Sequence, residues 1–141
     1  MKVQTYLFFE GRCEEALAFY RQTLAAEIGP LMRFRDNPDD PDHTMFPPGA
    51  GEMVMHAEMT IGETTVFLSD GRCGGSPNFT GMCLTLVLKK PEEAETLFRA
   101  LAETGQVRMP LRPTFFSPAF GMVADKFGLG WMIYTEQARP A

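Results

Sequence analysis

Short apolar runs, interrupted by two segments with helical periodicity, dominate the pattern of this chain. Residues 3–9 form a β-rich apolar run that ends at a Glu-Gly pair, which predicts a strand. In residues 13–25, apolar positions recur at helical spacing opposite charged ones and predict a helix. Further strands are predicted at residues 28–34, 53–60 and 64–69. The first half therefore has the order β-α-β-β-β.

The second half repeats this order. A strand is predicted at residues 82–88, and a helix follows at residues 92–103. Three more strands are predicted at residues 106–111, 120–124 and 131–134. The halves are joined by a glycine- and proline-rich connection, which predicts a loop rather than a regular element.

The two halves also match residue by residue. When residues 6–21 are placed over residues 84–99, Cys13 aligns with Pro91 and Arg21 with Arg99, so both ends give an offset of 78 (91 − 13 and 99 − 21). Glu-Glu-Ala and an aromatic-Arg pair recur at the same places. A duplicated half is typical of a pseudo-twofold protein whose site lies between the halves.

Alternation along a strand fixes which side chains share a face. The more apolar face is expected under the helix, which places Leu84, Leu86 and Leu88 beneath the second helix. The repeat then places Tyr6 and Phe8 beneath the first helix.

The same rule applied to the other strands buries Val66 and Leu68 in the first half, and Trp131 and Ile133 in the second. The opposite faces are expected to line a cavity. The predicted lining is Thr5, His56, Glu58, Phe67, Ser69, Cys83, Thr85 and Met132.

His56 and Glu58 are the ionisable pair in this lining. An imidazole titrates near neutrality, and a neighbouring carboxylate would fix its tautomer, so the pair could perform acid–base catalysis. A structural polar pair and a ligand-binding pair without catalysis are the alternatives. His56 could also act as the base for a Cys83 nucleophile, although a cysteine in a strand is more often a small buried hydrophobe.

Composition narrows the classes of partner. The chain has 141 residues and a net charge of −5, which argues against nucleic acid or an anionic membrane as partner. No apolar run approaches the roughly 20 residues of a membrane span, and the first residues lack the apolar core of a signal peptide. Three cysteines without a Cys-x-x-Cys pair indicate reduced thiols, so a cytoplasmic location is expected.

The segment 35–51 is rich in Asp, Pro and Gly, and it predicts a mobile loop. His43 lies beside its acidic residues 36–42, where a metal cluster is conceivable. A solvated loop is the better interpretation, because no regular structure would hold those carboxylates in place.

Two β-α-β-β-β modules in a chain of this length resemble the vicinal oxygen chelate superfamily, which includes glyoxalase I, extradiol dioxygenases and antibiotic-resistance proteins. Residues 125–131, Asp-Lys-Phe-Gly-Leu-Gly-Trp, resemble that superfamily's turn before the last strand. Residues 6–9, 13–20, 55–59, 109–111 and 120–128 are similar to the PhnB-like branch. That branch often carries a 3-demethylubiquinone 3-methyltransferase-like label, but no segment here resembles an S-adenosylmethionine site.

In metal-using members of the superfamily, the ligands come from the first and fourth strand of each module. The resemblance places Thr5, Phe67, Cys83 and Met132 at these positions. The family pattern there is His or Gln and Glu, and Phe67 offers no lone pair. The resemblance therefore implies that the usual metal is absent and that no cofactor is needed.

These observations predict an α+β fold in one glyoxalase-like domain, residues 1–141, with modules at residues 1–70 and 80–136. The modules would form a cupped, mixed sheet of eight strands with the helices outside. Relatives in the superfamily assemble as dimers, so a homodimer is expected. The leading functional hypothesis is a metal-independent protein that binds a small molecule. The alternative is an enzyme of the glyoxalase or dioxygenase type, either a lyase or isomerase that uses His56 and Glu58 or a metal enzyme with unconventional ligands.

Overall fold

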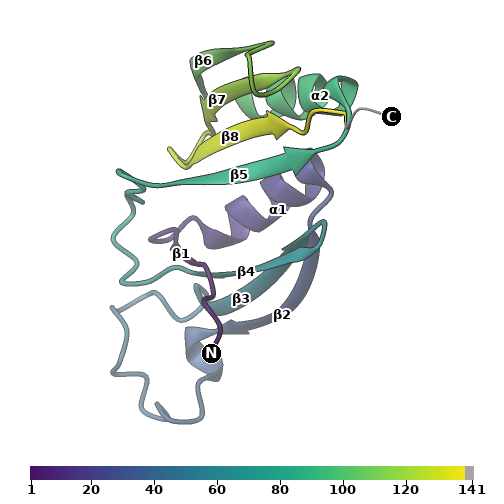
Figure 1. The fold of residues 1–141 in the computed structure, drawn as a ribbon. Helices are drawn as coiled ribbons and strands as arrows, with labels where there is room; N and C mark the ends of the chain where they lie inside the picture. The colour runs from purple at the N-terminus through teal and green to yellow at the C-terminus, as the bar shows by residue number, and fades with distance from the viewer. Residues whose placement is uncertain (139–141) are drawn as a thin grey trace. The chain divides into compact units, whose positions relative to one another are not determined.

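The computed structural model describes residues 1–138, and the β-α-β-β-β order appears twice within that range (Figure 1). The chain divides into two compact units, Met1–Pro77 and the segment from Asn78 onward, which are described separately. The first contains β1 (Tyr6–Phe8), α1 (Cys13–Leu24), β2 (Glu27–Arg33), β3 (Val54–Ile61) and β4 (Thr64–Ser69). The second contains β5 (Cys83–Leu88), α2 (Pro91–Ala102), β6 (Gln106–Arg112), β7 (Phe120–Ala124) and β8 (Gly130–Thr135).

Each unit has one mixed sheet of four strands, so the eight predicted strands are divided between two sheets. The strand orders are β1-β4-β3-β2 and β5-β8-β7-β6, which are the same order in the two repeats. In each sheet the first pair is parallel and the other two pairs are antiparallel. The α+β class and the repeated module are therefore confirmed.

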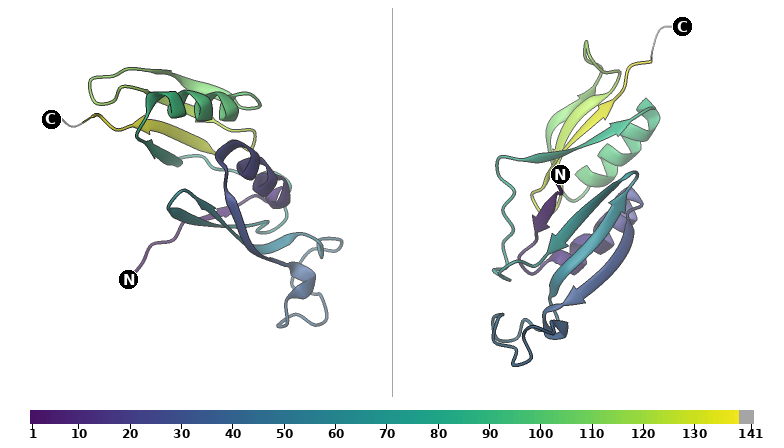
Figure 2. Two further views of the ribbon diagram at one scale, coloured as in Figure 1. Left: turned by 90° about the vertical axis from the view of Figure 1, so that its right-hand side faces the viewer. Right: turned by 60° about the horizontal axis from the view of Figure 1, so that its bottom comes forward.

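One helix packs against one face of each sheet (Figure 2). Helix α1 ends where Ala25 adopts a left-handed conformation (φ 54°) and the amide of Ala26 donates a hydrogen bond to the carbonyl of Tyr20 (3.2 Å). Helix α2 begins with Pro91, whose missing N–H costs nothing in the first turn. The side chains that α1 buries are Cys13, Ala16, Leu17, Tyr20 and Leu24.

Most of the predicted core faces are confirmed. Val66 and Leu68 are 3% and 0% exposed in β4, and Trp131 and Ile133 are 2% and 0% exposed in β8. In β5, Leu84, Leu86 and Leu88 form the less exposed face, while Thr85 and Val87 are exposed.

The prediction that Tyr6 and Phe8 pack beneath α1 is wrong. Leu7 is 1% exposed and Phe9 is fully buried, and the Phe9 ring contacts that of Tyr20 on α1 at a centroid distance of 6.2 Å. Tyr6 and Phe8 are 39% and 50% exposed on the opposite face. Thr5 alternates with Tyr6, so it shares the face of Leu7 rather than the open face where the sequence analysis placed it.

The error arises in the connection between β1 and α1. Counted from the last buried residue at the end of each strand, Phe9 or Leu88, three residues (10–12) precede α1 but only two (89 and 90) precede α2. Glu10 and Gly11 both adopt positive φ (54° and 112°), which produces a wider turn in the first unit. A shift by one residue exchanges the two faces of a strand, so an alignment anchored on the helices assigns β1 the wrong face.

The buried carboxylate of Asp70 stabilises the turn between β1 and α1 by hydrogen bonds. Asp70 is 2% exposed, and its Oδ1 accepts hydrogen bonds from the amides of Gly11 and Cys13, both at 2.8 Å. Its Oδ2 accepts a third from the amide of Val54 at 2.7 Å. One side chain therefore joins the turn after β1, the start of α1 and the start of β3.

The outer strands β2 and β6 are both irregular and both contain a proline. Pro30 lies at a register shift between Ile28 and Leu31, and Pro110 at one between Met109 and Arg112. A proline lacks the amide that a central strand would need, so it is tolerated at the edge of a sheet.

The segment 35–51 contains no strand or α-helix, as predicted, and a short 3-10 turn at Phe34–Asp36 overlaps its start. Asp40, which is 3% exposed, accepts hydrogen bonds from the amides of Thr44 (2.9 Å) and Met45 (3.0 Å).

In the described part of the chain, no helix is long and apolar enough to span a bilayer.

Candidate functional site on the open face of the first sheet

Aromatic and ionisable side chains gather on the face of the first sheet that α1 does not cover. Strand pairing explains how they meet, because Phe67 of β4 lies opposite both Tyr6 of β1 and Glu58 of β3. Directly opposed residues point to the same face, so these three form a row across the sheet. His56 lies two residues from Glu58 along β3 and therefore shares this face.

These side chains are in contact. The hydroxyl of Tyr6 lies 2.9 Å from Nδ1 of His56, and Nε2 of His56 lies 3.5 Å from Oε1 of Glu58. The imidazole also meets the edge of the Phe67 ring, with centroids 5.0 Å apart. Both nitrogens of His56 therefore face a polar partner, and the ring is held on a third side by Phe67.

The cluster is open to solvent. The side chains of His56 and Glu58 are 35% and 37% exposed. The Phe8 ring stacks on Tyr6 at 5.1 Å, and Met32, opposite His56 on β2, is also exposed. This surface combines apolar area with a small number of polar groups, which is the usual composition of a ligand site.

The contact between His56 and Glu58 favours one tautomer. With the proton on Nε2, the imidazole faces the Glu58 carboxylate with a donor, and Nδ1 is left as an acceptor for the Tyr6 hydroxyl. Burial raises the pKa of the Tyr6 phenol, although a hydrogen bond with Ser69 acts in the opposite direction. Tyr6 is therefore protonated near neutral pH and is the donor in this pair.

The structure brings together three of the residues predicted in the first unit, namely His56, Glu58 and Phe67. Ser69 is 4% exposed, and its hydroxyl accepts a hydrogen bond from the amide of Gly71 (2.9 Å) and donates one to the carbonyl of Val54 (3.4 Å). Thr5 lies on the other face, and Tyr6 takes its place in the cluster. The sequence analysis missed Tyr6 as a site residue. It placed Tyr6 and Phe8 together on one face of their strand, but it assigned that face to the side beneath the helix.

The predicted site residues of the second unit lie on β5 and β8. Thr85 is the direct partner of Met132, and Cys83 is the partner of Gly130. Cys83 also lines a shallow pocket of about 350 Å³ together with Arg108. A role for Cys83, Thr85 and Met132 in ligand binding stays a prediction.

Among residues 1–138, no three or more His, Cys, Asp or Glu side chains are grouped closely enough to hold a metal ion. Strand β1 presents Tyr6, rather than Thr5, on the open face of the sheet. The Tyr6 hydroxyl is already hydrogen-bonded to His56. His43 lies in the 35–51 segment and contacts the ring of Phe46 at 5.8 Å.

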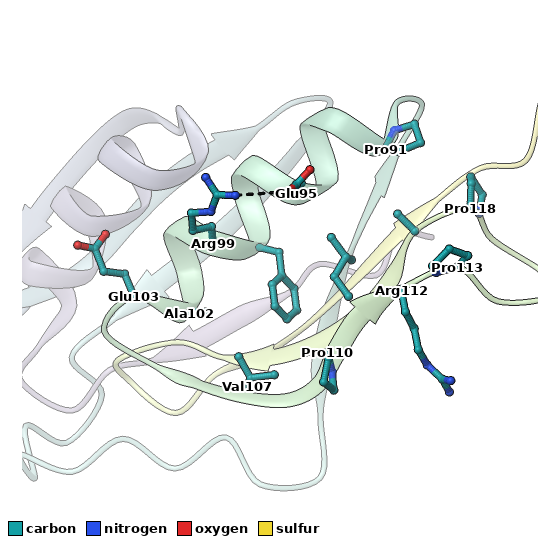
Figure 3. A pocket seen from close by; sticks show the side chains of 13 residues that line it. Pro91, Glu95, Arg99, Ala102, Glu103, Val107, Pro110, Arg112, Pro113 and Pro118 are labelled. Carbon is teal, nitrogen blue, oxygen red and sulfur yellow. Dashed lines mark hydrogen bonds and ion pairs between the residues drawn. The ribbon is translucent and has the colours of Figure 1, made fainter.

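A second concave surface lies within the second unit, between α2 and the outer strand β6 (Figure 3). This groove has a volume of about 890 Å³ and an apolar floor that includes Phe98 and Leu111, with four prolines around it. The Phe98 ring lies over Gly121, where an added Cβ would be 2.9 Å from its Cε2 atom.

The first unit closes the corresponding position with an ion pair. Arg33 of β2 and Glu14 of α1 form two hydrogen bonds of 3.1 and 2.7 Å. In the second unit Arg112, the last residue of β6, lies opposite Phe120 in the register that Arg33 has with Val54, and Arg112 lines the groove.

The fold and the repeated module define the class of protein. Residues 1–134 match the family described as 3-demethylubiquinone-9 3-methyltransferase, and the chain belongs to this family. A glyoxylase/bleomycin resistance protein/dioxygenase domain from Frankia, at 14% identity and a TM-score of 0.64, shares the fold alone. The resemblance to the PhnB-like branch of the vicinal oxygen chelate superfamily is confirmed.

Particular relatives span the whole chain. Protein YjdN of Escherichia coli K12 is 32% identical over 148 aligned residues, which cover 99% of each protein. The structure of PA1353 from Pseudomonas aeruginosa is 35% identical with a TM-score of 0.82, over 98% of this chain and 99% of that one. A PhnB protein from Bacillus cereus is 30% identical with a TM-score of 0.77, over 96% and 99%.

Proposed function

We propose that this protein binds a small, partly apolar molecule on the open face of its first sheet, without a protein-bound metal ion. The supporting observation is the cluster of Tyr6, His56, Glu58 and Phe67, in which partly exposed aromatic rings lie beside the Tyr6–His56 hydrogen bond and the contact of His56 with Glu58.

Metal independence is supported by the chemistry of the side chains. Phe67 and Met132 occupy the fourth-strand positions at which metal-using superfamily members have a ligand, and neither offers an oxygen or imidazole donor. Methyl transfer, which the family description names, is not part of the proposal, because the sequence contains no segment resembling an S-adenosylmethionine site.

An acid–base enzyme is the second candidate, and one specific contact favours it. The hydrogen bond between Tyr6 and Nδ1 of His56, with Glu58 on the other side of the ring, is an arrangement that can accept or return a proton. A lyase or isomerase that abstracts a proton next to a carbonyl would need such a group.

The two candidates differ in their response to His56→Gln. For a binding protein, we expect this variant to weaken ligand binding by less than about tenfold, because one hydrogen bond is lost. For an acid–base enzyme, turnover should fall about a hundredfold or more. The measurement is ligand titration by protein-observed NMR, with ligands taken from native mass spectrometry of co-purified molecules. His43→Asn is the matched control, because Asn tolerates the positive φ of 56° at that position.

The same samples test the metal. Protein purified without chelators should carry no stoichiometric metal, and dialysis against EDTA should leave its thermal unfolding temperature and its ligand binding unchanged. Stoichiometric nickel, zinc or iron that is lost on dialysis together with binding would overturn the proposal. So would a ligand whose chemical-shift changes avoid Tyr6, His56 and Phe67.

A further inference from the structure

We propose that Tyr6, His56 and Glu58 form a proton relay that binds a hydroxylated aromatic molecule, a phenol, and holds it as its anion. This inference rests on the proposed ligand site and adds the class of ligand. It also assigns a role to Tyr6, which the sequence analysis did not place in the site.

The direction of the hydrogen bonds determines what the ligand must offer. Glu58 lies against Nε2 of His56, which places the ring proton there and makes Nδ1 an acceptor. The phenolic proton of Tyr6 is then used in the 2.9 Å bond to Nδ1. One lone pair of the Tyr6 oxygen faces Ser69, and the other accepts a hydrogen bond from the ligand. A ligand that donates from a hydroxyl group fits this requirement.

The surroundings of Tyr6 favour a flat, apolar ligand body. Phe8 stacks on Tyr6 with ring planes 25° apart, and Phe67 presents its edge to Tyr6 at 6.0 Å. Phe8 is half exposed, and Met32 adds exposed apolar area opposite His56. An aromatic ring that lies on this surface gains stacking and edge contacts while its hydroxyl reaches Tyr6.

The proton transfer balances without another reactant. The ligand hydroxyl gives its proton to the Tyr6 oxygen, and Tyr6 gives its own proton to Nδ1 of His56. The products are a bound phenolate and an imidazolium whose Nε2–H faces the Glu58 carboxylate. No bond to carbon is formed or broken, and no electron is transferred.

Other groups around His56 do not compete for this proton. Met32 of β2 and Phe67 of β4, which face His56 from the neighbouring strands, do not titrate. Ser69, whose hydroxyl contacts backbone groups and also Tyr6, does not titrate. The raised pKa of Tyr6 makes tyrosinate unfavourable, so the negative charge resides on a more acidic ligand.

The test uses 4-nitrophenol, whose phenolate and phenol forms have distinct absorption bands. Binding lowers the apparent pKa of the probe by about one unit, since the nearby imidazolium favours the anion. The phenolate band therefore appears on binding at a pH where the free probe is mostly protonated. 4-Nitroanisole is the matched probe without an ionisable hydroxyl, and both are followed by NMR shifts of Tyr6 and Phe67.

Variants separate the relay from simple binding. Tyr6→Phe and His56→Gln should weaken 4-nitrophenol binding only a few-fold but abolish the phenolate band, while Glu58→Gln should reduce it. The controls are His43→Asn and Glu63→Gln, since Glu63 lies in the turn after β3, and both should behave as wild type. Thermal unfolding checks that each variant is folded.

The outcomes separate the two proposals. If both probes shift the resonances of Tyr6 and Phe67 but 4-nitrophenol stays protonated, the relay is wrong and the binding site stands. A phenolate band that persists in Tyr6→Phe also overturns the relay. If neither probe perturbs this face at millimolar concentration, the phenol-binding relay is overturned, and the binding site is then decided by the co-purified ligand alone.

Discussion

Cys13 lies at the first position of α1, where a thiol is usually made more acidic by the helix dipole. Here the environment acts in the opposite direction. The side chain is fully buried, and burial raises the pKa of the Cys13 thiol, with the Asp70 carboxylate adding to the effect. Asp70 is present for structural reasons, because it holds three backbone amides. Cys13 is therefore a core residue, and it has no thiolate to offer as a nucleophile.

This environment predicts the order in which the cysteines react. At pH 8, iodoacetamide should modify Cys73 and Cys83, which are partly exposed, while Cys13 stays unmodified until the chain is unfolded. Burial also raises the pKa of Cys73, so its labelling should speed up as pH increases. Peptide mass spectrometry after timed quenching measures each site. Modification of Cys13 as fast as that of Cys73 would contradict the structure.

At the scale of elements, one aspartate organises the turn between β7 and β8. Asp125 is 3% exposed, and it accepts hydrogen bonds from the amides of Phe127 (2.9 Å) and Leu129 (3.2 Å). Its second oxygen accepts one from the indole nitrogen of Trp131, also at 2.9 Å. The superfamily-like segment of residues 125–131 thus connects the turn to the largest buried side chain of the second unit.

Asp125→Ala should destabilise the protein by about 2–4 kcal/mol, because it leaves the buried indole N–H and two amides without this acceptor. Equilibrium unfolding in urea, followed by Trp131 fluorescence, measures the loss. Asp39→Ala is the control, since Asp39 lies in the exposed part of the 35–51 segment, and it should change stability by less than about 0.5 kcal/mol. Equal effects of the two variants would show that the Asp125 hydrogen bonds contribute little.

Alternation predicted the faces of the later strands because the more apolar residues of each strand recur at every second position. His56 and Glu58 fall on the open side of β3 for this reason, and Trp131 falls on the covered side of β8. The face of β1 could not be predicted, because it depends on the φ angles of Glu10 and Gly11 in the following turn. The relay therefore became visible only with the structure, although two of its three members were predicted.

At the scale of the whole molecule, the repeated modules leave apolar side chains uncovered. In the second unit, Phe115 and Val87 are 94% and 57% exposed. Large exposed apolar groups of this kind mark contact surfaces. We propose that a second copy of the chain covers them in a homodimer, as the resemblance to the superfamily implies.

Sedimentation velocity should therefore show a species of twice the 15.8 kDa chain mass. Phe115→Ser should weaken association by about tenfold or more, because a buried aromatic anchor is lost from the interface. Val3→Ser, which changes an exposed apolar residue of the first unit, is the control and should leave the dimer intact. A monomer at every concentration tested would contradict the proposal.

The prolines in β2 and β6 have a consequence for the chain at high concentration. Pro30 and Pro110 interrupt the row of amide donors along one border of each sheet, and the neighbouring register shifts bend that border. An incoming extended peptide would find no continuous ladder there to extend, which protects these borders from fibril-like growth. Self-association at these two borders is thereby limited to contacts between side chains, where a stoichiometric assembly can close and stop.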